Sequence, residues 1–209
     1  MGKIKKGILG GFSGRVGNVI GGSWKGIDYM RSEATSIADP KTAKQLEQRS
    51  KFRVAVEFAK QVVPLINIGL KQYATKRSEF NYLVSRICKD WWDDANDNIN
   101  YPLVQLSAGE LPNETISNVL FEVGSSDVNV SVQWDMSNPE FGSNYSAVCL
   151  VDLDDGNCYF HYNSEDLTRD NEASNLTLPL TASRNNYCVY LFFYDPQTMQ
   201  CSATTFYKP

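Results

Sequence analysis

The 209-residue sequence contains a single histidine, His161, so a metal site or a mechanism built on two histidines is excluded. It also lacks any run of about 18 apolar residues, and we therefore expect no membrane-spanning helix. No two of its five cysteines have Cys-x-x-Cys spacing, and their number is odd. This pattern favours reduced, buried thiols over a disulfide framework.

Basic residues are scarce near the C-terminus and acidic residues near the N-terminus. Residues 112–209 contain three Lys or Arg against thirteen Asp or Glu, a net charge of −10. Residues 1–32 contain six basic residues and one acid, a net charge of +5, and the part between them carries +1. The net charge of −4 for the whole chain is therefore the sum of a basic N-terminal segment and a strongly acidic C-terminal one. The basic segment suits an acidic partner.

The first residues of the sequence match a secretory signal only in part. Lys3, Lys5 and Lys6 precede an apolar stretch, but Arg15 and several glycines interrupt it. We therefore expect no signal peptide and a protein that is cytoplasmic or virion-associated. The glycines also lack the Lys-Ser or Lys-Thr of a phosphate loop.

The chain divides into three parts: residues 1–33, 34–111 and 112–209. The first is a glycine-rich basic arm, in which Trp24-Lys25-Gly26-Ile27 predicts the tight turn of a β-hairpin. Such a hairpin buries too little surface to be stable alone, so it must pack against something else.

The second part, residues 34–111, is predicted to be helical. Asp39-Pro40 is a typical helix start. Pro64 predicts either a kink or a new helix. One apolar stripe, at spacings of mostly three and four, consists of Ala43, Leu46, Phe52, Ala55, Val56, Ala59 and Val63. A second stripe runs from Phe80 to Trp91.

The third part, residues 112–209, has the period of two that is typical of strands. Seven short strands separated by Asn, Asp, Ser, Gly and Pro clusters predict an antiparallel β-sandwich of immunoglobulin or fibronectin type III kind. Asp154-Asp155-Gly156-Asn157 is its clearest hairpin turn. Trp134 should lie between the sheets, with Val130 and Val132 on the same face. The fold class predicted for the whole chain is α+β.

No motif in the sequence indicates catalysis. A Gly-x-Ser-x-Gly nucleophile pattern is absent. Asp90, Asp93, Asp94 and Asp97 have the spacing of one helical face, where they could hold a hard cation or simply be solvated. We predict a protein that is not an enzyme, with no catalytic residue, cofactor or metal.

The basic arm is the candidate interaction site. The residues predicted for this interface are Phe12, Arg15, Trp24, Lys25, Tyr29 and Arg31. We expect self-association or incorporation into a larger protein assembly, with no membrane partner. Positive charge interleaved with aromatic residues also suits single-stranded nucleic acid, which is the less favoured alternative. A ligand- or carbohydrate-binding sandwich, the remaining alternative, would gather Phe141, Tyr145 and Tyr194 in one concave patch.

The opening Gly10-Gly11-Phe12-Ser13-Gly14-Arg15-Val16-Gly17, followed by Ser23-Trp24-Lys25-Gly26, closely resembles that of an uncharacterised family widespread in Bacteroidetes. The Asp39-Pro40-Lys41-Thr42 helix start is similar to that of the same family. The family has no assigned activity, so the resemblance implies architecture alone. A looser similarity to tailed-phage proteins implies a structural role in a phage-like virion.

Overall fold

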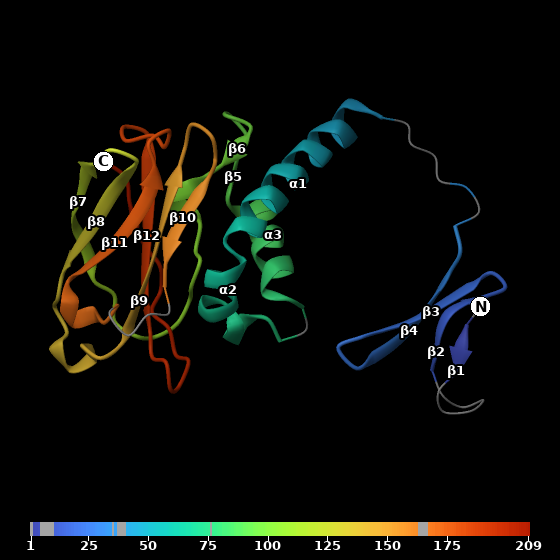
Figure 1. Ribbon diagram of the computed structural model, residues 1–209. Helices are drawn as coiled ribbons and strands as arrows, with labels where there is room; N and C mark the ends of the chain where they lie inside the picture. The colour runs from blue at the N-terminus through green and yellow to red at the C-terminus, as the bar shows by residue number, and fades with distance from the viewer. Residues whose placement is uncertain (1, 5–10, 35, 37–40, 76, 163–166) are drawn as a thin grey trace. The chain divides into compact units, whose positions relative to one another are not determined.

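The computed structural model describes residues 2–4, 11–34, 36, 41–75, 77–162 and 167–209. The chain forms two compact units, residues 1–46 and 47–209 (Figure 1). The first contains a small sheet, and the second combines helices with antiparallel sheets, so the predicted α+β class is confirmed. Among the described residues, no helix is long and apolar enough to cross a membrane.

The first unit is a four-stranded antiparallel sheet rather than a single hairpin. Its order is β1 (Lys3–Ile4), β2 (Phe12–Val16), β3 (Val19–Trp24) and β4 (Ile27–Ser32). The predicted turn is confirmed, because Trp24 pairs with Ile27 while Lys25 and Gly26 adopt φ angles of 46° and 81°. Positive φ at both positions is what a type I′ hairpin turn requires. Gly17-Asn18 forms a second two-residue turn, which adds β2 to the predicted hairpin.

Helix α1 (Ala43–Gln61) begins later than the sequence predicts. The predicted start at Asp39-Pro40 lies outside the described residues. The Gln45 N–H donates to Thr42 Oγ1 at 3.4 Å, and the Thr42 N–H donates to Gln45 Oε1 at 3.3 Å. These reciprocal bonds form a capping box, so Thr42 is the cap.

The first apolar stripe is buried only in its second half. Leu46 and Phe52 on α1 are 50% and 57% exposed, whereas Ala55 and Ala59 are fully buried. Only the second half of the predicted apolar stripe is therefore part of the core. Helical spacing shows which side chains share a face, but burial also needs an element opposite them.

Pro64 begins a new helix, one of the two predicted alternatives. Helix α2 (Val63–Gly69) has Pro64 in its first turn, where no backbone N–H is needed. Helix α3 (Glu79–Asp90) is capped by Ser78 and buries the second predicted stripe. Short elements complete this part: η1 (Lys71–Tyr73), β5 (Trp92–Asp93), β6 (Asn98–Ile99) and η2 (Tyr101–Leu103).

The remaining strands pair in two antiparallel sheets. One has the order β11 (Ala173–Pro179), β8 (Asp127–Asp135) and β7 (Thr115–Val123). The other has the order β10 (Cys158–His161), β9 (Tyr145–Asp152), β12 (Tyr187–Tyr194) and β13 (Thr205–Tyr207). The predicted turn at residues 154–157 joins β9 to β10. Two 3-10 turns, η3 (Pro139–Phe141) and η4 (Arg169–Asn171), lie in the connections.

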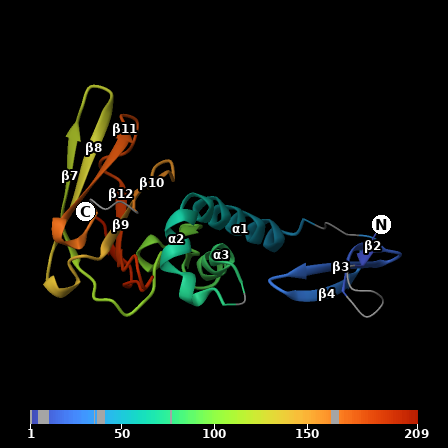
Figure 2. The same cartoon turned by 60° about the horizontal axis from the view of Figure 1, so that its bottom comes forward.

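Strands β9 and β12 form the middle layer of the second unit, between the β11-β8-β7 sheet and the helices (Figures 1 and 2). Val148 and Leu150 of β9 pack toward the other sheet, whereas Ala147, Cys149 and Val151 belong to the core that contains the helices. The expected boundary at 111/112 therefore falls inside one compact unit, because helices and strands share a core.

The predicted phase of β8 is confirmed. Val130, Val132 and Trp134 are buried in the core between the two sheets, and Trp134 is only 1% exposed. The Trp134 ring meets the Phe193 ring edge-on, with centroids 5.5 Å apart. Its indole N–H donates to the backbone oxygen of Arg169 at 3.1 Å, so the polar end of this buried side chain is satisfied.

All five cysteines are free thiols in the structure, and Cys149, Cys188 and Cys201 are buried. Burial raises the pKa of Cys188 to about 12 and that of Cys201 to about 11. We expect an aromatic disulfide reagent to titrate five thiols after unfolding without reductant, with the three buried thiols protected in the native protein. Fewer than five thiols after unfolding would contradict this prediction.

Candidate protein–protein interface

The four-stranded sheet of the first unit presents two chemically different faces. Side chains that are opposite one another in an antiparallel register lie on the same face, and the face alternates along each strand. Trp24 is opposite Ile27, and Ile20 is opposite both Arg31 and Arg15. We call this side the aromatic–basic face, formed by Arg15, Ile20, Trp24, Ile27, Tyr29 and Arg31.

The opposite side, the apolar face, carries Phe12, Val16, Val19 and Met30. Two adjacent glycines let aromatic rings lie close to the backbone, one on each face. A Cβ atom on Gly21 would be 2.8 Å from Cδ2 of Phe12, and one on Gly22 would be 2.8 Å from the hydroxyl of Tyr29. Glycine at these two positions therefore keeps both rings against the sheet.

Both faces of this sheet are exposed. Trp24 on the aromatic–basic face is 54% exposed, and Met30 on the apolar face is 71% exposed. Gly21 is the only residue of these strands that is buried among those described. Contiguous exposed apolar surface is uncommon on soluble monomers and marks interaction sites.

The structure brings together four of the six predicted interface residues. Arg15, Trp24, Tyr29 and Arg31 share the aromatic–basic face, whereas Phe12 lies half-buried on the apolar face. Lys25 lies in the turn between β3 and β4.

The prediction omitted four exposed apolar residues: Val16, Val19, Ile27 and Met30. For Val16 and Val19 the missed signal was the Gly17-Asn18 dipeptide, because a two-residue turn places these two residues opposite one another.

Positive charge dominates the aromatic–basic face. Arg15 forms an exposed ion pair with Glu33 at 2.7 Å and also donates from Nε to the Gly17 oxygen at 3.2 Å. A pair this exposed contributes little to stability, so it serves mainly to orient the guanidinium group. Asp28 is opposite Ser23, which places its carboxylate on the other side of the sheet.

The acidic cluster does not lie on one helical face, contrary to the predicted spacing. Helix α3 ends at Asp90, Asp93 belongs to strand β5, and Asp94 and Asp97 follow that strand. The side-chain amide of Asn96 donates to Asp93 at 2.6 Å, and this bond lowers the pKa of the Asp93 carboxyl. Among the described residues, no group of three or more His, Cys, Asp or Glu could hold a metal ion.

The aromatic residues proposed for a ligand-binding sandwich do not form one concave patch. Tyr194 is buried and meets the Tyr145 ring edge-on, with centroids 5.8 Å apart. Phe141 instead lies near the guanidinium of Arg169, whose Cζ is 5.9 Å from the centroid of the Phe141 ring. Tyr145 lines a cavity together with Asn144 and Thr168.

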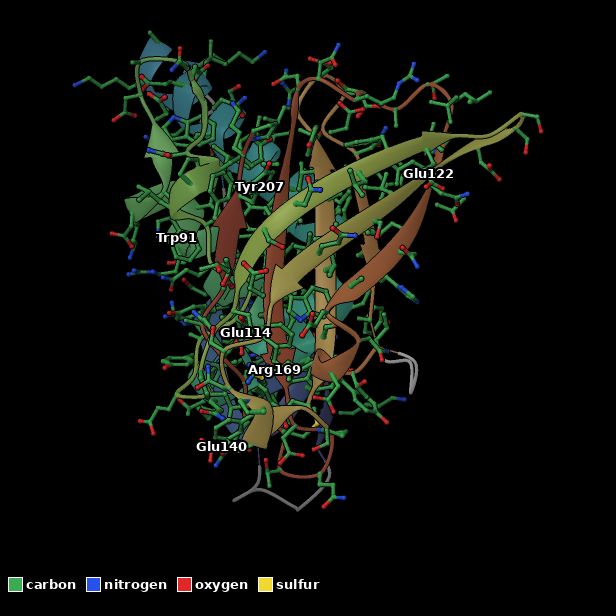
Figure 3. All side chains as sticks on the ribbon, turned by 90° about the vertical axis from the view of Figure 1, so that its left-hand side faces the viewer. Trp91, Glu114, Glu122, Glu140, Arg169 and Tyr207 are labelled. Carbon is green, nitrogen blue, oxygen red and sulfur yellow. The ribbon has the colours of Figure 1, made fainter. Side chains whose placement is uncertain are left out.

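Arg169 and Glu114 form a fully buried ion pair at one end of the sandwich (Figure 3). Arg169 Nη1 lies 3.8 Å from Glu114 Oε1, and Nη2 donates to the oxygen of Pro112. The guanidinium also stacks over the Phe193 ring, with Cζ 4.1 Å from the centroid. Burial raises the pKa of Glu114, but hydrogen bonds from Ser137 and Asn138 and the Arg169 charge outweigh it and lower that pKa. This pair ties the chain before β7 to the segment before β11.

Comparison with known families gives one match. A family model described as a family of unknown function (DUF6266) matches residues 11–207. Neither the curated proteins nor the solved structures give a significant match. The expectation of an uncharacterised family is therefore confirmed, and the function must be argued from the geometry.

Proposed function

The chain belongs to this family of unknown function, and we propose that it is a non-enzymatic protein that assembles with copies of itself through the four-stranded sheet. The observation that carries this proposal is the exposure of large apolar side chains on both faces of that sheet. A sheet without a covering layer gains stability when another chain covers it.

Charge complementarity supports a second copy as the partner. The arm carries +5 over residues 1–32, and residues 112–209 carry −10. Register places Glu122, Asp127 and Asp135 on the outer side of the β11-β8-β7 sheet, away from the core. Figure 3 labels Glu122 on this sheet. We propose that the aromatic–basic face of one copy lies on this acidic surface of another. Opposite charges would set the orientation, and the desolvated aromatic residues would supply most of the affinity.

We also propose that the sandwich is of fibronectin type III kind. With β7 to β13 lettered A, B, C, C′, E, F and G, the sheets have the orders E-B-A and C′-C-F-G. In a constant-type immunoglobulin domain the fourth strand pairs with the A-B-E sheet. Here the fourth strand, β10, pairs instead with β9 of the other sheet.

The likeness of the opening to tailed-phage proteins is the reason to consider a virion-like particle as the larger assembly.

Sedimentation velocity over a range of concentrations tests the assembly. We expect the full-length protein to associate, and Trp24→Ala to raise the concentration at half-association by tenfold or more, as for a central aromatic residue. The matched control is Tyr73→Ala, which removes an exposed aromatic side chain of η1 outside the arm. Moderate salt should weaken association by screening the charges.

Two results would contradict the proposal. The first is a wild-type protein that stays monomeric at the highest concentration tested. The second is a Tyr73→Ala variant that loses association as strongly as Trp24→Ala, because the effect would then not belong to the arm.

A further inference from the structure

A cavity of about 500 Å³ opens at one end of the sandwich. Its lining includes Asn144, which precedes β9, and Tyr145, the first residue of β9. It also includes Thr168 from the segment before β11, and Asp195 and Gln197 from the connection after β12. Connections that meet at the end of a sandwich are where this architecture carries binding sites on a rigid scaffold. The volume lies within the usual range for small-ligand sites.

We propose that this cavity binds a neutral, hydroxyl-rich ligand of the size of a mono- or disaccharide. The proposal does not depend on the assembly proposed above, because the cavity and the four-stranded sheet belong to different compact units.

Backbone hydrogen bonds hold the walls of the cavity in place. The N–H of Ser146 donates to Leu167 at 2.6 Å, and the N–H of Arg169 donates to the oxygen of Asn144 at 2.8 Å. These two bonds join the start of β9 to the segment before β11. A site whose walls are already ordered loses less conformational entropy when a ligand binds.

Two side chains supply polar groups of complementary kind. Asn144 is 7% exposed, and its Nδ2 has no hydrogen-bond partner among the described residues. A buried donor left in this state is costly, and rotation of this amide toward the cavity, where a ligand hydroxyl would accept from it, would remove that cost. The Asp195 carboxylate accepts from the Gln197 N–H at 2.8 Å and from the Thr198 hydroxyl at 2.7 Å, and these bonds lower its pKa. It therefore offers a charged acceptor to ligand hydroxyls.

Tyr145 supplies the apolar surface that a sugar ring needs. Its ring is half-buried and is held at 79° to the Tyr194 ring. Tyr145 is one of the residues that line the cavity, together with the polar residues named above. A sugar has both a C–H face and several hydroxyl groups, so it matches this combination of an aromatic ring with amides and a carboxylate.

The charges around the cavity favour a neutral ligand. Asp195 is the only charged residue among those described as lining it. The guanidinium of Arg169 is buried against Glu114, so it cannot neutralise an anion in the cavity. An anionic ligand would meet Asp195 within a region of net charge −10. A calcium ion would find a single carboxylate, whereas it prefers six to eight oxygen ligands.

The test is binding of the full-length protein to an array of immobilised neutral mono- and disaccharides, with sialylated and sulfated glycans as a second arm. Affinity for the strongest neutral binder is then measured by isothermal titration. We expect Thr168→Val combined with Gln197→Ala to weaken it at least tenfold, since both groups line the cavity. The matched control is Gln105→Ala, an exposed glutamine outside the cavity, which should leave the affinity unchanged.

Three outcomes would overturn the proposal: no binding to any neutral glycan, stronger binding to the anionic glycans, or neutral-glycan binding that the cavity variants leave unchanged. Circular dichroism of each variant distinguishes loss of the site from loss of the fold. Because sedimentation reports assembly separately, failure here leaves the proposed assembly function untouched.

Discussion

Replacing Trp134 by alanine should lower the free energy of unfolding by about 3–5 kcal/mol, the usual cost of deleting a large buried aromatic side chain. The ring fills the space between the two sheets, where it contacts Phe193. Its removal also leaves the Arg169 oxygen without the indole donor that it now has at 3.1 Å. The measurement is urea unfolding followed by far-ultraviolet circular dichroism, which does not depend on the deleted fluorophore.

Trp24→Ala is the matched control for this variant. Trp24 is also a tryptophan on a strand, but it is 54% exposed and belongs to the first compact unit. At a concentration where the protein is monomeric, we expect Trp24→Ala to change the unfolding free energy by less than about 0.5 kcal/mol, as is usual for surface positions. Similar losses for the two variants would contradict the assignment of Trp134 to the core.

Replacing Arg169 by methionine should cost about 3–5 kcal/mol, because it leaves the carboxylate of Glu114 buried without its counter-charge. Arg169→Met retains most of the apolar contact with Phe193, so the loss should come from the charge rather than from packing. Arg184→Met, at an exposed position, is the matched control and should be neutral. Equal effects of the two substitutions on urea unfolding would show that the buried pair has no special role.

The same ion pair should leave a signature in the pH dependence of stability. The pKa of Glu114 is lower in the folded protein than its ordinary value. A carboxyl of this kind contributes stability above its unfolded pKa, and the contribution is lost as the pH falls through the folded pKa. We expect Glu114→Gln to flatten the acid side of the stability profile, below about pH 4.5. If the unfolding free energy of this variant fell with decreasing pH as steeply as that of the wild type, the role assigned to Glu114 would be contradicted.

Local chemistry was enough to predict several elements from the sequence. Lys25-Gly26 sets the turn between β3 and β4 because positive φ is accessible there. At Pro64 the sequence left two alternatives, a kink or a new helix, and the structure has the new helix α2 with Pro64 in its first turn. Alternation along β8 was sufficient to place Trp134 in the core, since one face of that strand is polar and the other apolar.

The candidate interface was predictable in part for the same reason. Arg15, Trp24, Tyr29 and Arg31 were identified from composition, and the type I′ turn fixes the register of β3 and β4. The division of this sheet into two faces was not predicted, because it also depends on how β2 pairs with β3 through Gly17-Asn18.

Only the tertiary structure decided what covers each apolar surface. Periodicity placed Leu46 and Ala55 in one apolar stripe of α1, yet Leu46 is exposed while Ala55 is buried. The unbroken apolar runs of β9 and β12 are explained by helices on one side and a sheet on the other. A short continuous run is consistent with burial on both faces, but it does not identify the two covering elements.

The buried ion pair and the cavity are also products of the tertiary structure. Glu114 and Arg169 are far apart in the sequence, and nothing near either residue marks it as buried. The cavity likewise needs three connections to meet, at Asn144, Thr168 and Asp195. The sequence by itself determined the hairpin turns and the phase of β8, because these depend on near neighbours. The tertiary structure decided the partners of those elements, because contacts between distant residues depend on the packing of the whole unit.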